Sequence, residues 1–257
     1  MVSNRQLFLR HVAQTSDASL AFEIERASGI YFYDSSGKKY IDLVSGVSVS
    51  ALGHGHPVVV DAVKRQAENY MHTMVYGEFI QSPQVEYASW LIEHLPASLD
   101  NVFFVNSGSE AIDGAMKLAK RVTGRGEFRA FDRAYHGGTH GALSLLGDAR
   151  ARSGSLPLLP GIKHLRFNCE EDLDLIDESV AGVVIEPIQA EAGIIEPEGN
   201  FLLKVRERCN ATGVMLILDE IQTGMGRTGR LLASEHYGVV PDILCLAKSF
   251  GGGMPLG

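Results

Sequence analysis

Length and composition indicate a globular chain, large enough for one large domain or for one and a half ordinary ones. The 257 residues are 45% hydrophobic and 21% charged, and the net charge is -8. A nucleic-acid surface is disfavoured because no basic residues cluster, and no apolar stretch reaches the roughly 18 residues that span a bilayer. Three cysteines (Cys169, Cys209 and Cys245) lie far apart without a CxxC motif, which suits a reduced, cytoplasmic compartment.

The N-terminal segment carries Arg5 and Arg10 but no acidic residue before residue 17. This composition would suit a transit peptide, but we expect an ordered N-terminal arm instead. Residues 29–43 predict a β-hairpin, because two aromatic and β-branched runs flank a turn at residues 34–37.

Helices are predicted next over residues 57–70, which carry an apolar stripe, and over residues 83–94. From residue 102 the pattern changes to short, wholly apolar runs, with helical stretches at about 109–122 and 200–211 between them. The apolar runs are residues 102–105, 180–185, 214–218 and 243–246, and a further strand is predicted at residues 128–131. This alternation predicts a parallel sheet covered on both faces. In such sheets ligands bind beyond the carboxyl ends of the strands, so polar residues that follow the runs are the candidate site.

The sequence NSGSEA at residues 106–111 follows the first of these runs and opens a helix. A hydroxyl-rich turn at a helix N-terminus offers free backbone N–H groups and the positive end of the helix dipole to a phosphate. The alternative is an ordinary N-cap, in which Ser107 or Ser109 acts with Glu110 in the first turn. The turn is neither a Walker loop nor a GxGxxG motif, so it does not indicate a nucleotide.

Asp219 directly follows an apolar run, where a carboxylate needs a charged or hydrogen-bonding partner. A protonated pyridine nitrogen would be such a partner, because a persistent anion there keeps the ring an electron sink. A helix N-cap and a metal ligand are the alternatives, although no His or Cys stands nearby at ligand spacing.

Lys248 follows the last apolar run and precedes a glycine-rich stretch. Partial desolvation would lower the pKa of its amine and free it to form a Schiff base, whereas the alternative is a surface lysine at a strand end. Tyr135 follows the strand predicted at 128–131 and could stack on a heteroaromatic ring, although most such tyrosines are simply packed. A phosphate turn, a stacking aromatic, a carboxylate and a lysine together indicate pyridoxal 5'-phosphate.

The sequence resembles the class III aminotransferases, a group of fold-type-I pyridoxal-phosphate enzymes that includes ornithine, acetylornithine and 4-aminobutyrate aminotransferases. The resemblance covers essentially the whole chain, and its motifs are LGHGHP from residue 52, NSGSEA from 106, AYHGGTHG from 134, EPIQAEAG from 186, DEIQTGMGRTGR from 219 and AKSFGGGMPLG from 247. It implies an α/β fold in which helices sandwich a mostly parallel sheet. Residues 1–52 would form an arm and hairpin of a small domain, and residues 53–257 an incomplete cofactor-binding large domain.

The resemblance also assigns roles to the matching residues. It places Ser107, Gly108 and Ser109 at the cofactor phosphate, Tyr135 on the ring face with His136 beside it, Asp219 at the ring nitrogen, Gln222 at the ring hydroxyl and Lys248 at the Schiff base and the proton transfer. Glu191 is similar to a glutamate that masks an active-site arginine between half-reactions. Glu186 is expected to support Gln222.

The implied reaction is a ping-pong transfer of an amino group from an amino acid or terminal amine to a 2-oxo acid, usually 2-oxoglutarate. The implied enzyme is a cytoplasmic homodimer that needs no metal. Alternatives are a glutamate-1-semialdehyde-type aminomutase, which requires no external oxo acid, and an inactive truncated product.

Two features depart from the family pattern. Gly138 stands where many ornithine-type and 4-aminobutyrate-type members have an arginine that helps bind a carboxylate. Family members also run to roughly 400 residues, whereas this sequence stops nine residues after Lys248. We therefore expect a C-terminal small domain and one antiparallel strand of the main sheet to be absent, and the 257 residues alone to be unstable and inactive.

Overall fold

The computed structural model describes residues 2–257 and divides them into two compact units, the second of which is His72–Gly257. The first unit consists of α1 (Asn4–His11), β1 (Arg26–Ser28), β2 (Tyr31–Tyr33), β3 (Lys39–Ile41), α2 (Ser45–Ser48) and α3 (Pro57–Asn69). The units divide after Met71 rather than after residue 52, and the extent of the cofactor-binding domain stays a prediction.

The predicted hairpin is confirmed as β2 and β3, and β1 adds a third antiparallel strand. Asp34 explains the turn, because its Oδ1 accepts hydrogen bonds from the backbone N–H of Ser36 at 2.9 Å and of Lys38 at 3.0 Å. The N-terminal arm contains α1, whose N-terminus is fixed by a capping box of Ser3 and Gln6.

The second unit is built on one parallel sheet with the strand order β5-β4-β6-β7-β8. Its elements are α4 (Ser82–His94), α5 (Gly108–Thr123), β4 (Glu127–Phe131), α6 (His140–Leu145), α7 (Ala149–Ser153), β5 (Ile162–Leu165), η1 (Glu170–Leu175), β6 (Val180–Ile185), α8 (Phe201–Thr212), β7 (Met215–Asp219), η2 (Ala233–Tyr237), β8 (Ile243–Cys245) and η3 (Lys248–Gly251). The predicted α/β architecture with a parallel sheet is confirmed.

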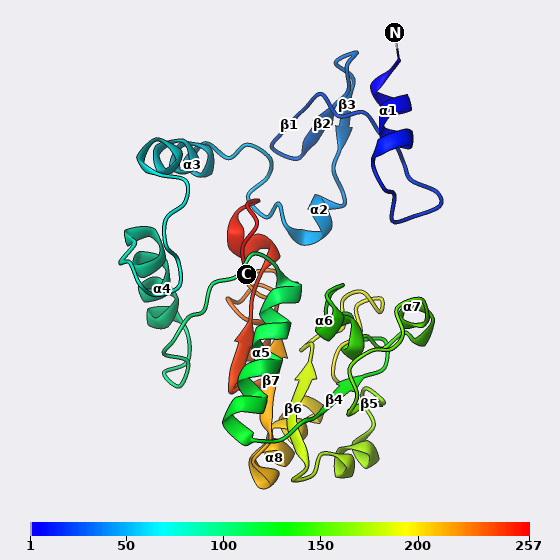
Figure 1. Cartoon of the computed structure of the whole chain (residues 1–257), viewed down its shortest axis with the longest axis vertical. Coiled ribbons are helices and arrows are strands. Elements are labelled where there is room, and N and C mark those ends of the chain that lie inside the picture. The colour runs from blue at the N-terminus through cyan, green and yellow to red at the C-terminus, as the bar shows by residue number, and fades with distance from the viewer. Residues whose placement is uncertain (1) are drawn as a thin grey trace. The chain divides into compact units, whose positions relative to one another are not determined.

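Helices cover both faces of this sheet, and α5 crosses its front in Figure 1. The core that includes α8 contains Val183, Ile185, Leu216, Leu218, Val205 and Cys209, and the core that includes α5 contains Ala181, Val184, Ile217, Ile112, Ala115 and Met116. Leu216 and Leu218 therefore face one core and Ile217 the other, as the two-residue period of a strand requires. Because both faces are buried, β6 is apolar throughout and β7 is apolar up to Asp219.

Four of the five predicted strands are confirmed as β4, β6, β7 and β8, but the strand predicted at residues 102–105 is wrong. Its Val105 exchanges two backbone hydrogen bonds with Gly257, at 2.8 and 2.9 Å, and belongs to no ladder. Phe103 in the same run is 81% exposed. Hydrophobicity alone is not enough to define a strand, since a ladder also needs a partner strand.

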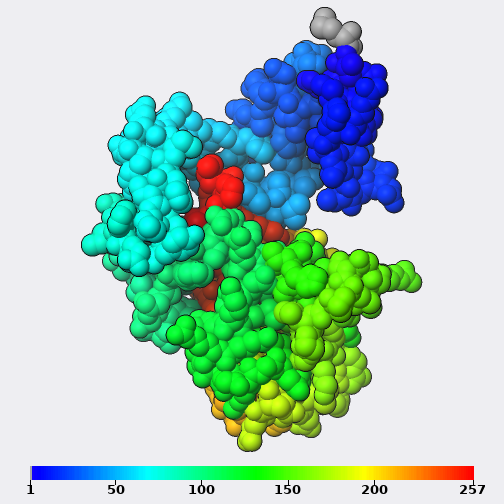
Figure 2. All heavy atoms as spheres, viewed as in Figure 1, coloured from blue at the N-terminus to red at the C-terminus, as the bar shows by residue number. Residues whose placement is uncertain are grey.

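The segment that carries α7 projects from the second unit, at the right of Figures 1 and 2. Among residues 2–257, no helix combines the length and apolar character that crossing a membrane requires.

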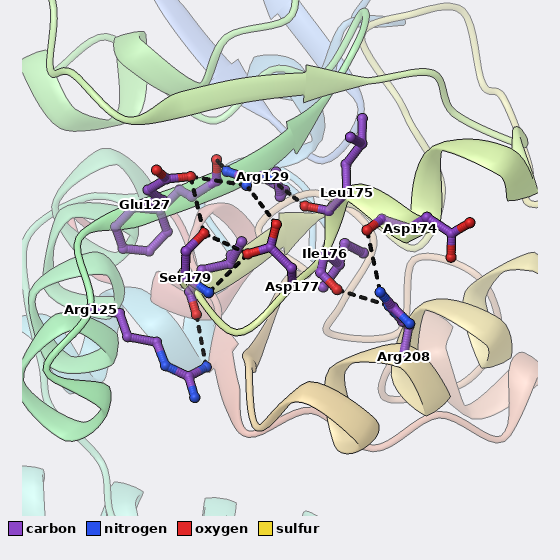
Figure 3. A network of polar contacts seen from close by, with 11 residues as sticks. Arg125, Glu127, Arg129, Asp174, Leu175, Ile176, Asp177, Ser179 and Arg208 are labelled. Atoms are coloured by element: carbon purple, nitrogen blue, oxygen red, sulfur yellow. Dashed lines mark hydrogen bonds and ion pairs between the residues drawn. The ribbon is translucent and has the colours of Figure 1, made fainter.

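Three arginines tie together the amino ends of the central strands (Figure 3). Arg125 donates to the carbonyls of Val180, Thr212 and Gly213, each at 3.1 Å. Arg208 donates to the carbonyl of Ile176 at 2.8 Å. These bonds satisfy backbone acceptors where β6 and β7 begin and where α8 ends.

The third arginine, Arg129, is 1% exposed and lies within β4. Its guanidinium donates to the carbonyl of Leu175 at 2.7 Å and pairs with Glu127 at 2.9 Å, as Figure 3 shows. Asp177 lies 3.9 Å from the same guanidinium. The charge is thus buried but compensated, at the edge of the sheet opposite the carboxyl ends of the strands.

Replacing Arg129 with alanine should lower the free energy of unfolding of the complete protein by about 3 kcal/mol, because it leaves a cavity in place of a large, fully buried side chain and removes the donor to the Leu175 carbonyl. Urea unfolding measures this loss. The matched control is Arg166→Ala, since the Arg166 side chain is 65% exposed and pairs with Asp172 at 2.6 Å. That variant should lose less than about 1 kcal/mol. Equal losses in both variants would contradict the prediction.

Candidate active site

The carboxyl ends of β4, β6, β7 and β8 lie along one edge of the sheet, because these strands are parallel neighbours. Tyr135 follows β4, Glu186 follows β6, Asp219 ends β7 and Lys248 begins η3 directly beyond β8. The sequence-based placement of Tyr135, Asp219 and Lys248 at strand ends is confirmed. The roles of these residues toward a ligand stay predictions.

Asp219 is 4% exposed and forms an ion pair with His136, which is 2% exposed. Its Oδ2 lies 2.7 Å from His136 Nδ1, and its Oδ1 accepts a hydrogen bond from the backbone N–H of Ile221 at 3.0 Å. Burial by itself would lower the pKa of His136, but the hydrogen bond with Asp219 and the charges of Asp219 and Glu186 outweigh it and raise that pKa. A protonated imidazole is therefore favoured beside the Asp219 side chain, and among residues 2–257 the buried Nε2 of His136 has no hydrogen-bond partner.

Lys248 stands in an uncommon backbone conformation. Its φ is 54°, in the left-handed region that residues other than glycine rarely adopt. Its Nζ donates to Oε1 of Gln222, which comes from the turn after β7. Burial lowers the pKa of the Lys248 amine, although the charges of Glu191, Asp219 and Glu186 oppose that shift. A larger share of the amine is thus in its neutral, nucleophilic form than in a surface lysine.

The sequence allowed two interpretations of the N-terminus of α5, an ordinary N-cap and a phosphate-binding turn, and the contacts there are compatible with both. Ser107 is its N-cap, since its Oγ accepts from the backbone N–H of Glu110 at 3.2 Å. Ser109 binds the loop after β4 instead, because its Oγ accepts from the backbone N–H of Gly138 at 3.0 Å. Gly108 packs so closely that an added Cβ would lie 2.8 Å from Ile221. Both hydroxyl protons remain available as donors to an anion.

Glu186 is 5% exposed, and its carboxylate binds two loops of the site. One oxygen accepts from the backbone N–H of Tyr135 at 2.9 Å, and the other from that of Ala190 at 3.1 Å. Glu186 and Gln222 share no hydrogen bond in the part of the chain that the structure describes, so the carboxylate supports the Tyr135 loop rather than Gln222. Tyr135 itself is 48% exposed, and Glu191 is exposed on the loop after β6.

Two structural carboxylates near the site were not predicted from the sequence. Glu220 is buried next to Asp219 and accepts hydrogen bonds from the Thr223 hydroxyl and from two backbone N–H groups at the start of η2. Asp113 of α5 accepts from the backbone N–H of Ala142 in α6 at 2.9 Å. A motif reading finds no signal for such contacts, because the partners are mostly backbone groups. Within residues 2–257 no group of three or more His, Cys, Asp or Glu could hold a metal ion.

Comparison with known proteins identifies the family and the fold of the chain. The model of the family described as aminotransferase class-III matches residues 12–257. The chain is 45% identical to the acetylornithine aminotransferase of Methanopyrus kandleri over 232 residues, which cover 89% of this chain and 59% of that protein.

Two solved structures superpose with a TM-score of 0.88 at 32% identity, each over 97% of this chain. One is the ornithine aminotransferase of Toxoplasma gondii, of which the match covers 60%. The other is the taurine:2-oxoglutarate aminotransferase of Bifidobacterium kashiwanohense in complex with PLP and glutamate, of which it covers 62%. The chain thus spans about three fifths of the length of each relative.

Proposed function

Since the chain belongs to the class-III aminotransferase family, we propose that the protein transfers an amino group from an amine donor to a 2-oxo acid, with pyridoxal 5'-phosphate as its cofactor. The observation that supports this most directly is Lys248. Its amine has a lowered pKa and lies at the carboxyl edge of the sheet, among residues that a pyridoxal ring requires. The family depends on this cofactor, and one of the solved relatives holds it.

The residues at this edge fit the cofactor group by group. Asp219 provides a buried anion for the ring nitrogen, and its charge is held by His136. The N-terminus of α5 provides backbone N–H groups and the Ser107 and Ser109 hydroxyls for the phosphate. Tyr135 provides an exposed aromatic ring for stacking on the pyridine face. The buried, unpartnered Nε2 of His136 adds a further polar atom in the same region.

The chain's own residues would then divide the work. When bound, pyridoxal phosphate supplies an aldehyde for the amine and a ring that withdraws electrons. Lys248 would hold the cofactor through Nζ, and the same amine would move a proton to or from the donor carbon. Gln222, which contacts Lys248, would orient the ring hydroxyl. Glu191 would hold or release an arginine that binds a substrate carboxylate, as the family resemblance implies.

We further propose a donor with a terminal amine and 2-oxoglutarate as acceptor. The named relatives support this choice, since they act on acetylornithine, ornithine and taurine, and the last name includes 2-oxoglutarate. Gly138 is exposed and has no side chain, so recognition of the donor does not rest on a side chain at this position. A cytoplasmic homodimer without a metal remains the expected form of the complete protein.

The alternative of an aminomutase is not favoured, because the relatives named above are aminotransferases. The test supplies the complete protein with pyridoxal phosphate and a panel of terminal amines, and measures glutamate formed from 2-oxoglutarate. We expect glutamate to form only when both substrates are present. A rearranged amine formed without any oxo acid would favour the mutase, and no cofactor binding at all would overturn the proposal.

A further inference from the structure

Glu186 has a contact pattern that the motifs do not predict. Its two carboxylate oxygens accept hydrogen bonds from backbone N–H groups of different loops, Tyr135 in the loop after β4 and Ala190 in the loop after β6. The residue is 5% exposed. One buried carboxylate therefore bridges the loop that carries Tyr135 and His136 to the loop that carries Glu191.

A second contact joins the same two loops. The Gln189 side chain is fully buried, and its Nε2 donates to the carbonyl of Asp132 at 2.9 Å. The backbone of Gln189 exchanges two hydrogen bonds with Ile195, at 2.9 and 3.0 Å, which closes the turn that presents Glu191. Because Gln189 holds its own turn together, Glu186 is the contact that can be removed without opening that turn.

The charged groups that face Glu186 make this contact sensitive to protonation. They are His136 from the loop after β4, Asp219 from β7 and Lys248 from η3. Burial, together with the negative charge of Asp219, raises the pKa of Glu186 to about 7, although His136 and the two backbone N–H groups oppose the shift. A protonated Glu186 would turn one of its two acceptor oxygens into a hydroxyl.

We propose that Glu186 is a positioning residue that holds the Tyr135 loop against the Glu191 loop, and that it does so fully only as a carboxylate. The expected effect on cofactor binding rests on the proposed function, because it requires Tyr135 to lie on the face of the cofactor ring. The coupling of the two loops does not rest on that function, because the hydrogen bonds of Glu186 to the two backbone N–H groups need no cofactor.

Hydrogen–deuterium exchange on the complete, cofactor-free protein tests the coupling. Glu186→Ala should raise the exchange rates of the Tyr135 and Ala190 amides, one in each loop, by about tenfold or more, since each lost bond to a charged acceptor is worth at least about 1.5 kcal/mol. Glu186→Gln keeps one acceptor oxygen, so only one of the two loops should accelerate. The matched control, Glu198→Gln, changes an exposed carboxyl close to the same loop and should leave both rates unchanged.

The pH profile separates this role from simple packing. After correction for intrinsic exchange, the wild-type loops should accelerate as the pH falls through about 7, and the Glu186→Gln loops should not. Unchanged exchange in both loops of Glu186→Gln, or a wild-type profile without this pH dependence, would overturn the proposal, whether or not Glu186→Ala folds.

Cofactor affinity provides the functional arm, measured by equilibrium binding of pyridoxal phosphate rather than by turnover. The dissociation constant should rise about tenfold in Glu186→Ala, in line with one lost charged hydrogen bond. If the wild-type protein binds no pyridoxal phosphate, the proposed function is refuted. The exchange measurement then still decides whether Glu186 couples the Tyr135 loop to the Glu191 loop. If binding is normal in every variant while exchange rises, the loops are coupled but the positioning of Tyr135 is refuted.

Discussion

Replacing Lys248 with alanine should abolish transamination by the complete protein, with a fall in kcat of about 10⁵-fold or more. The reason is that one amine would both hold the cofactor and move the proton, so its loss removes two steps together. Borohydride reduction followed by peptide mass spectrometry checks the attachment directly. In the wild-type protein the cofactor mass should be fixed on the peptide that contains Lys248, and in the variant on no peptide.

Two further variants control this experiment. Lys248→Arg keeps a positive charge but offers no nucleophilic amine, so it should be as inactive as the alanine variant. Lys117 is an exposed lysine of α5, and Lys117→Ala should keep both its activity and its borohydride product. Cofactor fixed on a different lysine, or turnover retained without Lys248, would refute the assignment.

Replacing Asp219 with asparagine should lower kcat by about 10³-fold, which is the scale of removing one preorganised electrostatic partner. It should also weaken the binding of pyridoxal phosphate. Asparagine keeps the shape of the side chain and an acceptor for the Ile221 N–H, but it removes the anion that would hold the ring nitrogen protonated. Steady-state kinetics and equilibrium binding measure the two effects.

The control for Asp219 is another carboxylate that follows a strand at the same edge. Asp132 follows β4 and is exposed, and it meets Gln189 through its backbone carbonyl rather than its side chain. Asp132→Asn should therefore keep activity within about twofold, as surface substitutions away from a site usually do. Near-normal turnover in Asp219→Asn would remove Asp219 from the ring-nitrogen role.

The parts of the fold that follow from local pattern were predictable from the sequence. β6 is buried at all six positions, and β7 is apolar up to Asp219, so a plain apolar run identifies each as a strand covered on both faces. β5 was not predicted, because it is an edge strand that includes Lys163 and His164 and shows no apolar run. Edge strands keep one side open to solvent, which weakens the hydrophobic signal.

The candidate site likewise contains residues that were predictable from the sequence and contacts that were not. Asp219 and Lys248 were predictable because a charged residue at the end of a buried strand needs a partner, and that requirement can be read from position alone. The hydrogen bonds of Glu186 to Tyr135 and Ala190 were not, since backbone N–H groups carry no sequence signature. The bond between Asp113 and Ala142 escaped prediction for the same reason.

The positive φ of Lys248 has a consequence for how this protein can change over time. A lysine in the left-handed region costs about 1–3 kcal/mol relative to an ordinary conformation, whereas a glycine would sit there without strain. Selection for stability alone would therefore favour losing this lysine. Lineages that keep the activity should therefore keep the lysine in spite of this cost, and lineages that lose the activity should drift toward glycine at this position.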